Sequence, residues 1–287
     1  MLGACAAATG SPTSAEKSAD LYGHKVEFNA KLAERVPAEW KNGITVPIQV
    51  LRPNAFVDDK GATVGLQPDL LKAMSAQLGI NITLETTSFD AQVPGVQANR
   101  YAFTTATGDF PKRREIMDMV DYTLAGLGYM VKKGSSIKSV EDICGKKIGV
   151  AKGTNQEILS EKTVEECTAK GIPGTEVVGF SNTIMTVPLE ADRVDVIYDS
   201  ISSVYYFKAN EAEKFVMVGP PRYDGVIAWG LVKGQKEKAD LLRDATQALV
   251  DDGTYAAVFK NWGLDELALE KVFVNSEGLD LAKYATK

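Results

Sequence analysis

The sequence predicts an α/β protein with largely parallel sheets. The main observation is that short strand-like segments alternate with helix-like segments along the chain, as in proteins built from strand–helix–strand units. The second is size and composition: 287 residues, 45% of them apolar and 24% charged, are enough for one large core or two smaller ones. In chain order we expect strands at 45–51, 81–86, 146–151, 177–180, 194–198 and 215–218, and helices at 68–79, after residue 153 and at 236–251.

The first predicted helix, 68–79, carries signals at both ends. Pro68 suits the first helical position, where its missing N–H is not needed, and Asp69 favours the positive end of the helix dipole. Gly79 can take the left-handed conformation that ends many helices. One apolar face is formed by Leu70, Leu71, Met74 and Leu78.

Two later segments are equally defined. Residues 146–151 read as a buried strand that turns at Gly153 into a helix, where Thr154 as N-cap and Glu157 three positions later fit a capping box. The helix at 236–251 is amphipathic, and we interpret it as a packed surface helix rather than a membrane binder. Its inward side chains are Leu241, Leu242, Ala245, Leu249 and Val250.

Charge and composition exclude several classes of function. The formal net charge is -6 and the pI about 5.1, which argues against nucleic acid as a partner. No apolar run reaches the roughly 18 residues of a membrane helix. His24 is the one histidine and lies near the N-terminus, so a histidine-based metal site or a Ser-His-Asp triad is not expected.

The three cysteines suggest export. The start MLGAC resembles the end of a lipoprotein signal, in which a cysteine after small residues, here Cys5, receives a lipid; the competing interpretation is a chance cysteine. Residues 6–20 are poor in large apolar side chains and suit a flexible tether. Under oxidising conditions Cys144 and Cys167 would form a disulfide worth about 3 kcal/mol in the chain-entropy model. Two buried thiols are the alternative.

A cation, a glycine turn and a carboxylate then follow one another along the chain. Arg113 lies in GDFPKRRE at 108–115, the turn is AKGTN at 151–155, and Asp199 ends RVDVIYD at 193–199. A guanidinium binds a carboxylate, a helix N-terminus binds an anion, and a carboxylate binds an ammonium group. Together they could hold a zwitterion.

Five segments in order resemble the polar-amino-acid solute-binding proteins, family 3, the receptor subunits of ABC importers. They are GLQPDLL at 65–71, FDAQVPGVQ at 89–97, PKRREIMDMVDY at 111–122, DICGKKIGV at 142–150 with Gly153 and Thr154, and DGTY at 252–255 with KNWG at 260–263. The resemblance covers roughly residues 45–265.

The resemblance implies a periplasmic-binding-protein-like fold of type II, with two α/β lobes joined by two hinge strands and a ligand cleft between them. It implies a tether at 1–25, lobe 1 at 26–127 plus 229–287, and lobe 2 at 132–224. The hinges would fall near 127–131 and 225–229.

The resemblance also assigns roles to the candidate residues. Arg113 would hold the ligand carboxylate, with Arg114 as the competing cation. The turn at Thr154 and Asn155 would add backbone N–H donors, although a plain capped helix start explains Thr154 equally well. Asp199 would bind the ligand ammonium, against the alternative of a helix cap, and Tyr198 would line the pocket.

The remaining candidates surround the ligand side chain. Phe89 would pack on it, unless it is a core residue, and Asp90 is a weaker candidate. Asn54 stands where the family usually has an aromatic side chain, beside Arg52, and Gly108 stands where a hydroxyl residue is common. These departures suggest a more polar or bulkier ligand, including ectoine-like or opine-like compounds.

The expected function is that of a monomeric, extracytoplasmic substrate-binding lipoprotein of an ABC importer. It would capture an amino acid or a related zwitterion, without any cofactor, and deliver it to a membrane permease. The lipid on Cys5 would be its sole membrane attachment. The alternatives are a dehydratase-like enzyme on the same fold and an extracellular sensor domain; no catalytic motif and no C-terminal membrane helix accompany either.

Overall fold

The computed structural model describes residues 17–181 and 184–284. The helices are α1 (Ala30–Ala33), α2 (Leu66–Leu78), α3 (Phe89–Gln97), α4 (Pro111–Arg114), α5 (Asn155–Ala169), α6 (Thr186–Glu190), α7 (Ile201–Asn210), α8 (Lys236–Asp251) and α9 (Thr254–Asn261). The strands are β1 (Ser18–Leu21), β2 (His24–Glu27), β3 (Ile44–Ile48), β4 (Phe56–Val57), β5 (Thr63–Val64), β6 (Ile82–Thr86), β7 (Thr104–Gly108), β8 (Met117–Lys132), β9 (Lys147–Ala151), β10 (Glu176–Phe180), β11 (Val196–Ser200), β12 (Phe215–Val232) and β13 (Phe273–Val274).

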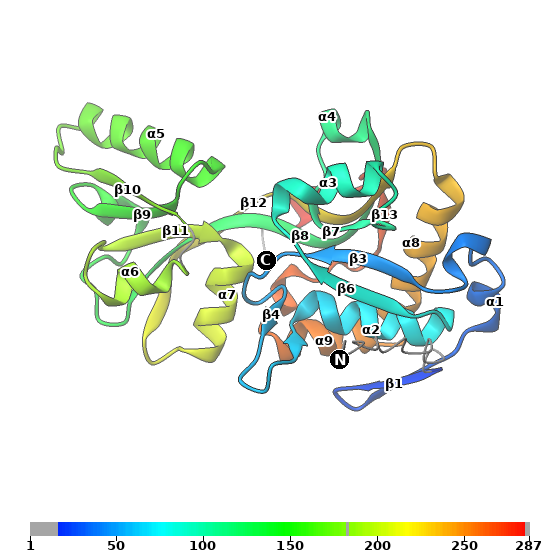
Figure 1. Ribbon diagram of the computed structural model, residues 1–287. Coiled ribbons are helices and arrows are strands. Elements are labelled where there is room, and N and C mark those ends of the chain that lie inside the picture. The colour runs from blue at the N-terminus through cyan, green and yellow to red at the C-terminus, as the bar shows by residue number, and fades with distance from the viewer. Residues whose placement is uncertain (1–16, 182–183, 285–287) are drawn as a thin grey trace, which may run out of the picture.

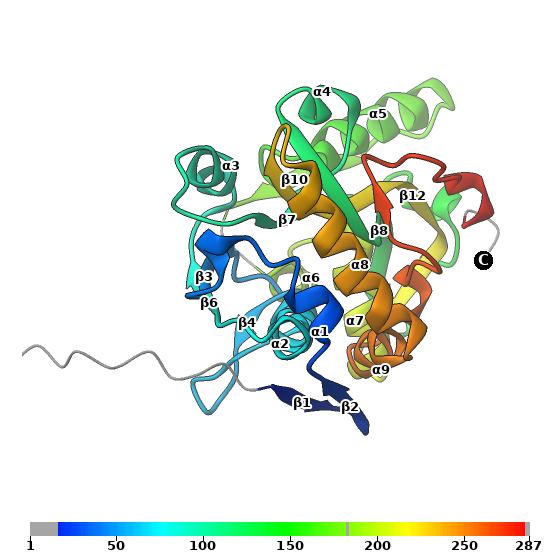
Figure 2. The ribbon, with the colours of Figure 1, turned by 90° about the vertical axis from the view of Figure 1, so that its right-hand side faces the viewer.

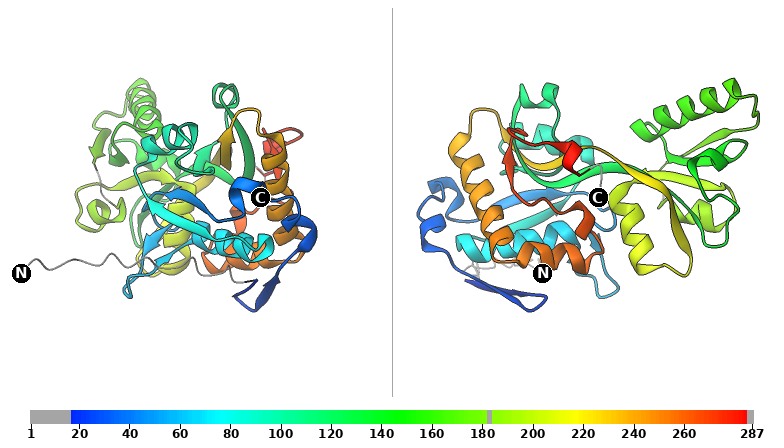
Figure 3. Two further views of the ribbon diagram at one scale, coloured as in Figure 1. Left: turned by 45° about the vertical axis from the view of Figure 1, so that its right-hand side comes forward. Right: turned by 180° about the vertical axis from the view of Figure 1, so that it is seen from behind.

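The elements fall into two units, visible in Figure 1. The small unit contains α5, α6, α7, β9, β10 and β11; the large unit contains the other elements except β8 and β12, which run from one unit to the other (Figure 3). The α/β class is confirmed, but the sheets are parallel only in part. Pairing is parallel within β3/β6 and β9/β10/β11, and antiparallel wherever β8 or β12 takes part.

The long strands β8 and β12 connect the two units. They pair with each other from Phe215 opposite Lys132 to Val232 opposite Met117, and the register shifts between Val218 and Arg222 and again before Gly225. At Gly126 an added Cβ would lie 2.2 Å from the Arg222 carbonyl oxygen, so a side chain there would force the strands apart. A further register shift, between Ile227 and Ala228, falls within the predicted crossing at 225–229.

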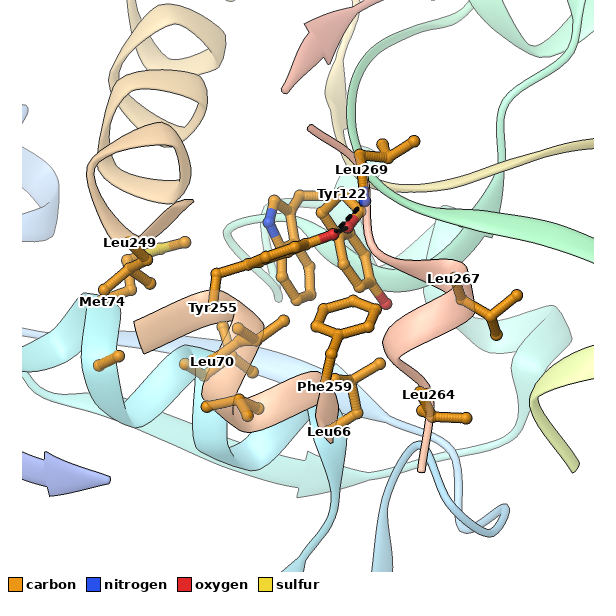
Figure 4. Packing of buried hydrophobic residues seen from close by; sticks show 14 of the residues in the cluster. Leu66, Leu70, Met74, Tyr122, Leu249, Tyr255, Phe259, Leu264, Leu267 and Leu269 are labelled. Atoms are coloured by element: carbon orange, nitrogen blue, oxygen red, sulfur yellow. Dashed lines mark hydrogen bonds between the residues drawn. The ribbon is translucent and has the colours of Figure 1, made fainter. Parts of the chain in front are cut away.

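The core of the large unit is aromatic. Trp229 of β12 stacks on Tyr122 of β8 with ring centroids 3.8 Å apart. The hydroxyl of Tyr255 donates to the Tyr122 carbonyl and accepts from the Leu269 amide (Figure 4). Helices α2, α8 and α9 gather on this side of the sheet (Figure 2), while α3 packs with Met119 and Ala228 against the other face.

The N-terminal segment is folded further toward its start than expected. Residues 18–27 form a hairpin, β1/β2, although a tether to residue 25 is predicted from the sequence. Tyr22 and Gly23 both have positive φ, as in the two-residue turns that match strand twist. Leu21 and Val26 are buried next to α2, and this burial offsets the low apolar content of the segment. Cys5 and the rest of the tether lie outside the described residues.

Two helix starts differ from the sequence expectation. Helix α2 begins at Leu66 rather than Pro68, because the amides of Leu66 and Gln67 bond to the carbonyls of Pro53 and Asn54. Gly79 ends the helix in the left-handed conformation as predicted.

At α5 the capping box is wrong in detail. The Thr154 hydroxyl donates to the Ala151 carbonyl instead of capping the helix, and Glu157 accepts from the Gly153 amide. The predicted disulfide is confirmed: Cys144 and Cys167 are bonded, which ties the turn before β9 to α5. None of the helices in the described residues is both long and apolar enough to cross a membrane.

Candidate ligand-binding site

Arg113 lies on the short helix α4, directly after strand β7. Its Nη1 donates to the Gly108 carbonyl at 2.7 Å, and its guanidinium carbon lies 4.2 Å from the centre of the Phe110 ring. Among the described residues it has no carboxylate partner within ion-pair distance. Burial lowers the pKa of Arg113, and the charge of Asp109 opposes that shift. A half-buried guanidinium without a paired anion favours a ligand carboxylate.

Arg114, the competing cation, is already occupied. Its Nε donates to Oδ1 of Asp109 at 2.6 Å, and the Asp109 side chain is fully buried. The structure therefore favours Arg113 over Arg114 as the carboxylate-binding residue. Sequence reasoning missed Asp109, because the two basic residues are adjacent and only the fold shows which one turns back to an acid five positions earlier.

Gly108 has space for a side chain. An added Cβ would lie 3.8 Å from Arg113 Nη1, an ordinary van der Waals distance. The hydroxyl that is common at this position is thus absent without a steric reason. The carbonyl of Gly108, rather than its N–H, makes the contact with Arg113 in this structure.

The turn before α5 is the small unit's contribution. Gly153 has φ +77°, a conformation that suits glycine, and Asn155 is exposed. Since the Thr154 side chain bonds backward to Ala151, it leaves the first amides of α5 uncapped. Uncapped amides at a helix N-terminus favour an anion. In Figures 1 and 2, α5 and α4 lie on the same side of the long strands.

Asp199 lies near the end of β11, immediately before α7. Its Oδ1 accepts from the Ser200 amide at 2.7 Å, and Ser203 provides a further hydrogen bond. The carboxylate is partly exposed, yet desolvation by the surrounding protein raises its pKa above the ordinary value. Ser200, not Asp199, is the N-cap of α7. A carboxylate with no cationic partner in the described chain favours an ammonium group.

The Tyr198 side chain does not lie beside the Asp199 side chain, although the two residues are adjacent in sequence. Successive residues of a strand point to opposite faces, and Tyr198 packs on Tyr129 with ring centroids 4.2 Å apart, in a buried cluster with Val196. Burial raises its pKa to about 12. Tyr198 thus packs in the core of the small unit.

Four further candidates lie in the large unit. Phe89 begins α3 and is 44% exposed, so the core alternative does not hold for it. Asp90 is exposed, and a hydrogen bond from Ser88 lowers its pKa. Asn54 is partly exposed in the loop before β4. Arg52 is held elsewhere, stacked 4.1 Å from the Phe56 ring centre with Nη1 3.5 Å from the Tyr206 hydroxyl of α7.

Two α/β units joined by paired long strands, with a cation on one and a carboxylate on the other that have no ion-pair partner among residues 17–181 and 184–284, define a type II periplasmic binding protein. The chain belongs to the bacterial extracellular solute-binding proteins, family 3, whose model matches residues 44–265. Members of this family bind solutes and are not enzymes, and they act outside the cytoplasm with ABC transporters.

Several relatives are named as amino-acid-binding proteins. The chain is 24% identical to the L-cystine-binding protein TcyJ of Escherichia coli K12, over 73% of this chain and 78% of that protein. It is 24% identical to the arginine-binding protein ArgT of Corynebacterium glutamicum, over 79% and 76% of the two chains. An ancestral arginine-binding protein solved with arginine has a TM-score of 0.59 at 27% identity, covering 76% of this chain and 97% of that one.

Proposed function

We propose that this protein captures an amino acid or a related zwitterion between its two units and delivers it to an ABC permease. The observation that carries the proposal is a pair of charges without an ion-pair partner in the described part of the chain, Arg113 on the large unit and Asp199 on the small unit. The ligands in the relatives' names, cystine and arginine, share an α-carboxylate and an α-ammonium group, which these two side chains suit.

Closure of the units is part of the proposal. Gly108 pairs with Ile227 of β12, and Ile227 pairs in turn with Thr123 of β8. Asp199 pairs with Gly128 of β8, so the two positions differ by 128 − 123 = 5 residues along β8. At the rise of a β-strand this is about 17 Å, too far for one amino acid to bridge two backbones without movement. The irregular pairing between Val218 and Gly225 is the place where we expect the strands to bend.

The same geometry suggests the lobe boundaries. Lobe 1 would correspond to the large unit and lobe 2 to the small unit, with the hinge at residues 125–128 of β8 and 218–225 of β12. The ligand side chain would meet Phe89, Asp90 and Asn54 from lobe 1, and the amides at Thr154 and Asn155 from lobe 2. Two acidic or amide groups beside an exposed ring favour a polar or cationic side chain.

We propose further that the mature protein is a monomer anchored to the outer face of the cell membrane by a lipid on Cys5. The small residues before this cysteine support the proposal, and about a dozen residues separate Cys5 from β1, which begins at Ser18. Expression of the full precursor with Cys5→Ala is expected to move the protein from the membrane fraction to the soluble fraction. Unchanged membrane association would refute lipidation at this residue.

A thermal-shift screen of ligand-stripped protein tests the central proposal. The set comprises the common L-amino acids, L-cystine, ectoine and an opine, because each carries a carboxylate and a cationic nitrogen in a different context. A ligand that binds only the folded protein at 100 times its Kd adds about 2.7 kcal/mol to the unfolding free energy. A rise in melting temperature with one of these zwitterions is the expected result; no rise with any of them would count against the proposed ligand class.

A further inference from the structure

The position of helix α4 is not fixed by burial of its own side chains. It has four residues, Pro111–Arg114, and none of them is buried. Its geometry depends instead on the ion pair between Arg114 Nε and Asp109 Oδ1, and on the contacts of Arg113 with the Gly108 carbonyl and the Phe110 ring. Asp109 is therefore one of the groups that hold α4, and with it Arg113, in place.

Asp109 is held by a segment far away in sequence. Its Oδ2 accepts from the Ser276 hydroxyl at 2.6 Å. The amide of Ser276 donates to Oδ2 of Asp121 at 2.9 Å, and the same hydroxyl lies 3.2 Å from that oxygen. Ser276 thus bridges the carboxyl groups of Asp109 and Asp121.

The bridging turn is itself fixed at a conformational cost. Asn275 and Ser276 both have φ of 55°, in the left-handed region that serine rarely adopts. Asn275 is bonded twice to Met119 of β8: its amide donates to the Met119 carbonyl at 2.7 Å, and its Oδ1 accepts from the Met119 amide at 2.9 Å. The turn is therefore a firm support rather than a loose loop end.

The second carboxyl group, that of Asp121, is buried and only partly hydrogen-bonded in the described chain. Its side chain is fully buried on β8, and Oδ1 has no hydrogen-bond partner among the described residues. Because Ser276 contacts both carboxyl groups, the two lie close together, and a proton on Asp121 would be shared with Asp109. Burial, and next the charge of Asp109, raise the pKa of Asp121 to about 8.

The charges that face this pair come mainly from α4. Arg114 contacts Asp109, and Arg113 is close enough to sense its charge. The paired residue on β12 is Ala228, and α3 presents Val93 and Val96 to the same face of the sheet. The turn that carries Ser276 adds one exposed acid, Glu277. No cation faces Asp121 directly in the described part of the chain.

We propose that Asp109, Asp121 and Ser276 position Arg113 for ligand binding, and that a proton shared by the two carboxyl groups keeps this support intact. The inference rests on the proposed function of Arg113. Loss of the proton leaves two adjacent carboxylates, which repel each other. Asp121 is fixed in the sheet, so Asp109 is the group that moves, and it carries Arg114 and α4 with it. Ligand affinity then falls as the pH rises through the titration.

The test compares the parent with Asp121→Asn, which keeps a donor toward Asp109 at every pH. Titration calorimetry with L-arginine, L-histidine and L-glutamine as probes is run between pH 6.5 and 9. We expect the parent to bind at least threefold more weakly at pH 9 than at pH 6.5, and the variant to show less than half of that change. The ionisation of the probe itself cancels because both proteins are titrated with the same molecule.

Asp118→Asn is the matched control. Asp118 is a buried carboxylate on the same strand, but it bonds to Lys233 and the Gly234 amide, away from α4. We expect it to keep the pH dependence of the parent. Equal pH profiles for the parent and Asp121→Asn would overturn the inference, as would a control that loses the pH dependence.

Ser276→Ala tests the bridge at constant pH. Removal of the hydroxyl, whose one proton is donated to Asp109 at 2.6 Å, should weaken probe binding about fivefold at pH 7, the usual effect of a single hydrogen bond. Unchanged affinity in this variant would contradict a positioning role.

A ligand-free measurement separates this inference from the proposed function. Since the folded pKa of Asp121 lies above the usual unfolded value of about 4, its contribution to stability is complete below pH 4 and is lost as pH rises to about 8. Hydrogen exchange of residues 108–116, corrected for its intrinsic pH dependence, should accelerate as pH rises from about 5 to about 8 in the parent and level off above that, but not accelerate in Asp121→Asn. If no probe binds, the proposed function fails; if exchange is the same in both proteins, the inference fails.

Discussion

Arg113→Ala is expected to weaken binding of the amino acid found by the screen by about 100- to 1,000-fold. Removal of one partner of a desolvated, hydrogen-bonded charge pair typically costs about 3–4 kcal/mol in binding free energy. Arg113 fits this case because it is half-buried and has no carboxylate partner among the described residues. Titration calorimetry at pH 7 measures the effect directly.

Two variants make this result specific. Lys112→Ala removes an exposed cation from the neighbouring position and should leave the affinity within about twofold of the parent, since exposed charges contribute little. Arg113→Lys keeps the charge but loses the forked pair of donors, so it should bind at an intermediate strength. An Arg113→Ala protein that binds as tightly as Lys112→Ala would remove Arg113 from the site.

Asp199→Asn is expected to weaken binding by about 100-fold. Asparagine has the same shape, and its Oδ1 can still accept the hydrogen bond from the Ser200 amide. The substitution removes the charge that would face the ligand ammonium group. The raised pKa of Asp199 adds a pH signature, because the carboxylate becomes protonated, and the affinity falls, at a higher pH than for an ordinary aspartate. The asparagine variant should lack this decline on acidification.

Asp192→Asn serves as the control for Asp199. It removes an exposed carboxylate of the same unit, one that pairs with Lys132. Parent-like affinity is expected for it. A similar loss of affinity in both variants would mean that the net charge of the small unit, rather than a contact with the ligand, is responsible.

The fold could be predicted where local signals agree with the final structure. Helix α8 begins at Lys236 and ends at Asp251 as expected, since its apolar face repeats with the helical period and packs on the sheet. The local pattern predicts strand β12 only at 215–218, because Gly219, Pro220 and Pro221 interrupt it, and the family resemblance adds a hinge strand at 225–229. The strand nevertheless continues to Val232 through its register shifts. Pairing with β8 overrides local propensity there.

The site could be predicted in part for a similar reason. Asp199 follows the strand predicted at 194–198, whereas strand β7, which precedes Arg113, is not among the predicted strands. Arg113 is preferred over Arg114 through the family resemblance, and the ion pair of Arg114 with Asp109, which supports that choice, depends on the fold. Ser276 lies 167 residues from Asp109, and no local pattern links the two. Contacts of this kind appear only in the folded chain.

The most direct test of the account is the distance between the two units with and without ligand. Spin labels at exposed Lys112 of α4 and exposed Glu161 of α5, in a Cys5→Ser background, report it by double electron–electron resonance. We expect the distance to shorten when the amino acid identified by thermal shift is added, and to stay at its ligand-free value when Arg113 is replaced by alanine. Tight binding with no change in the distance would contradict capture by closure of the two units on a ligand held between Arg113 and Asp199.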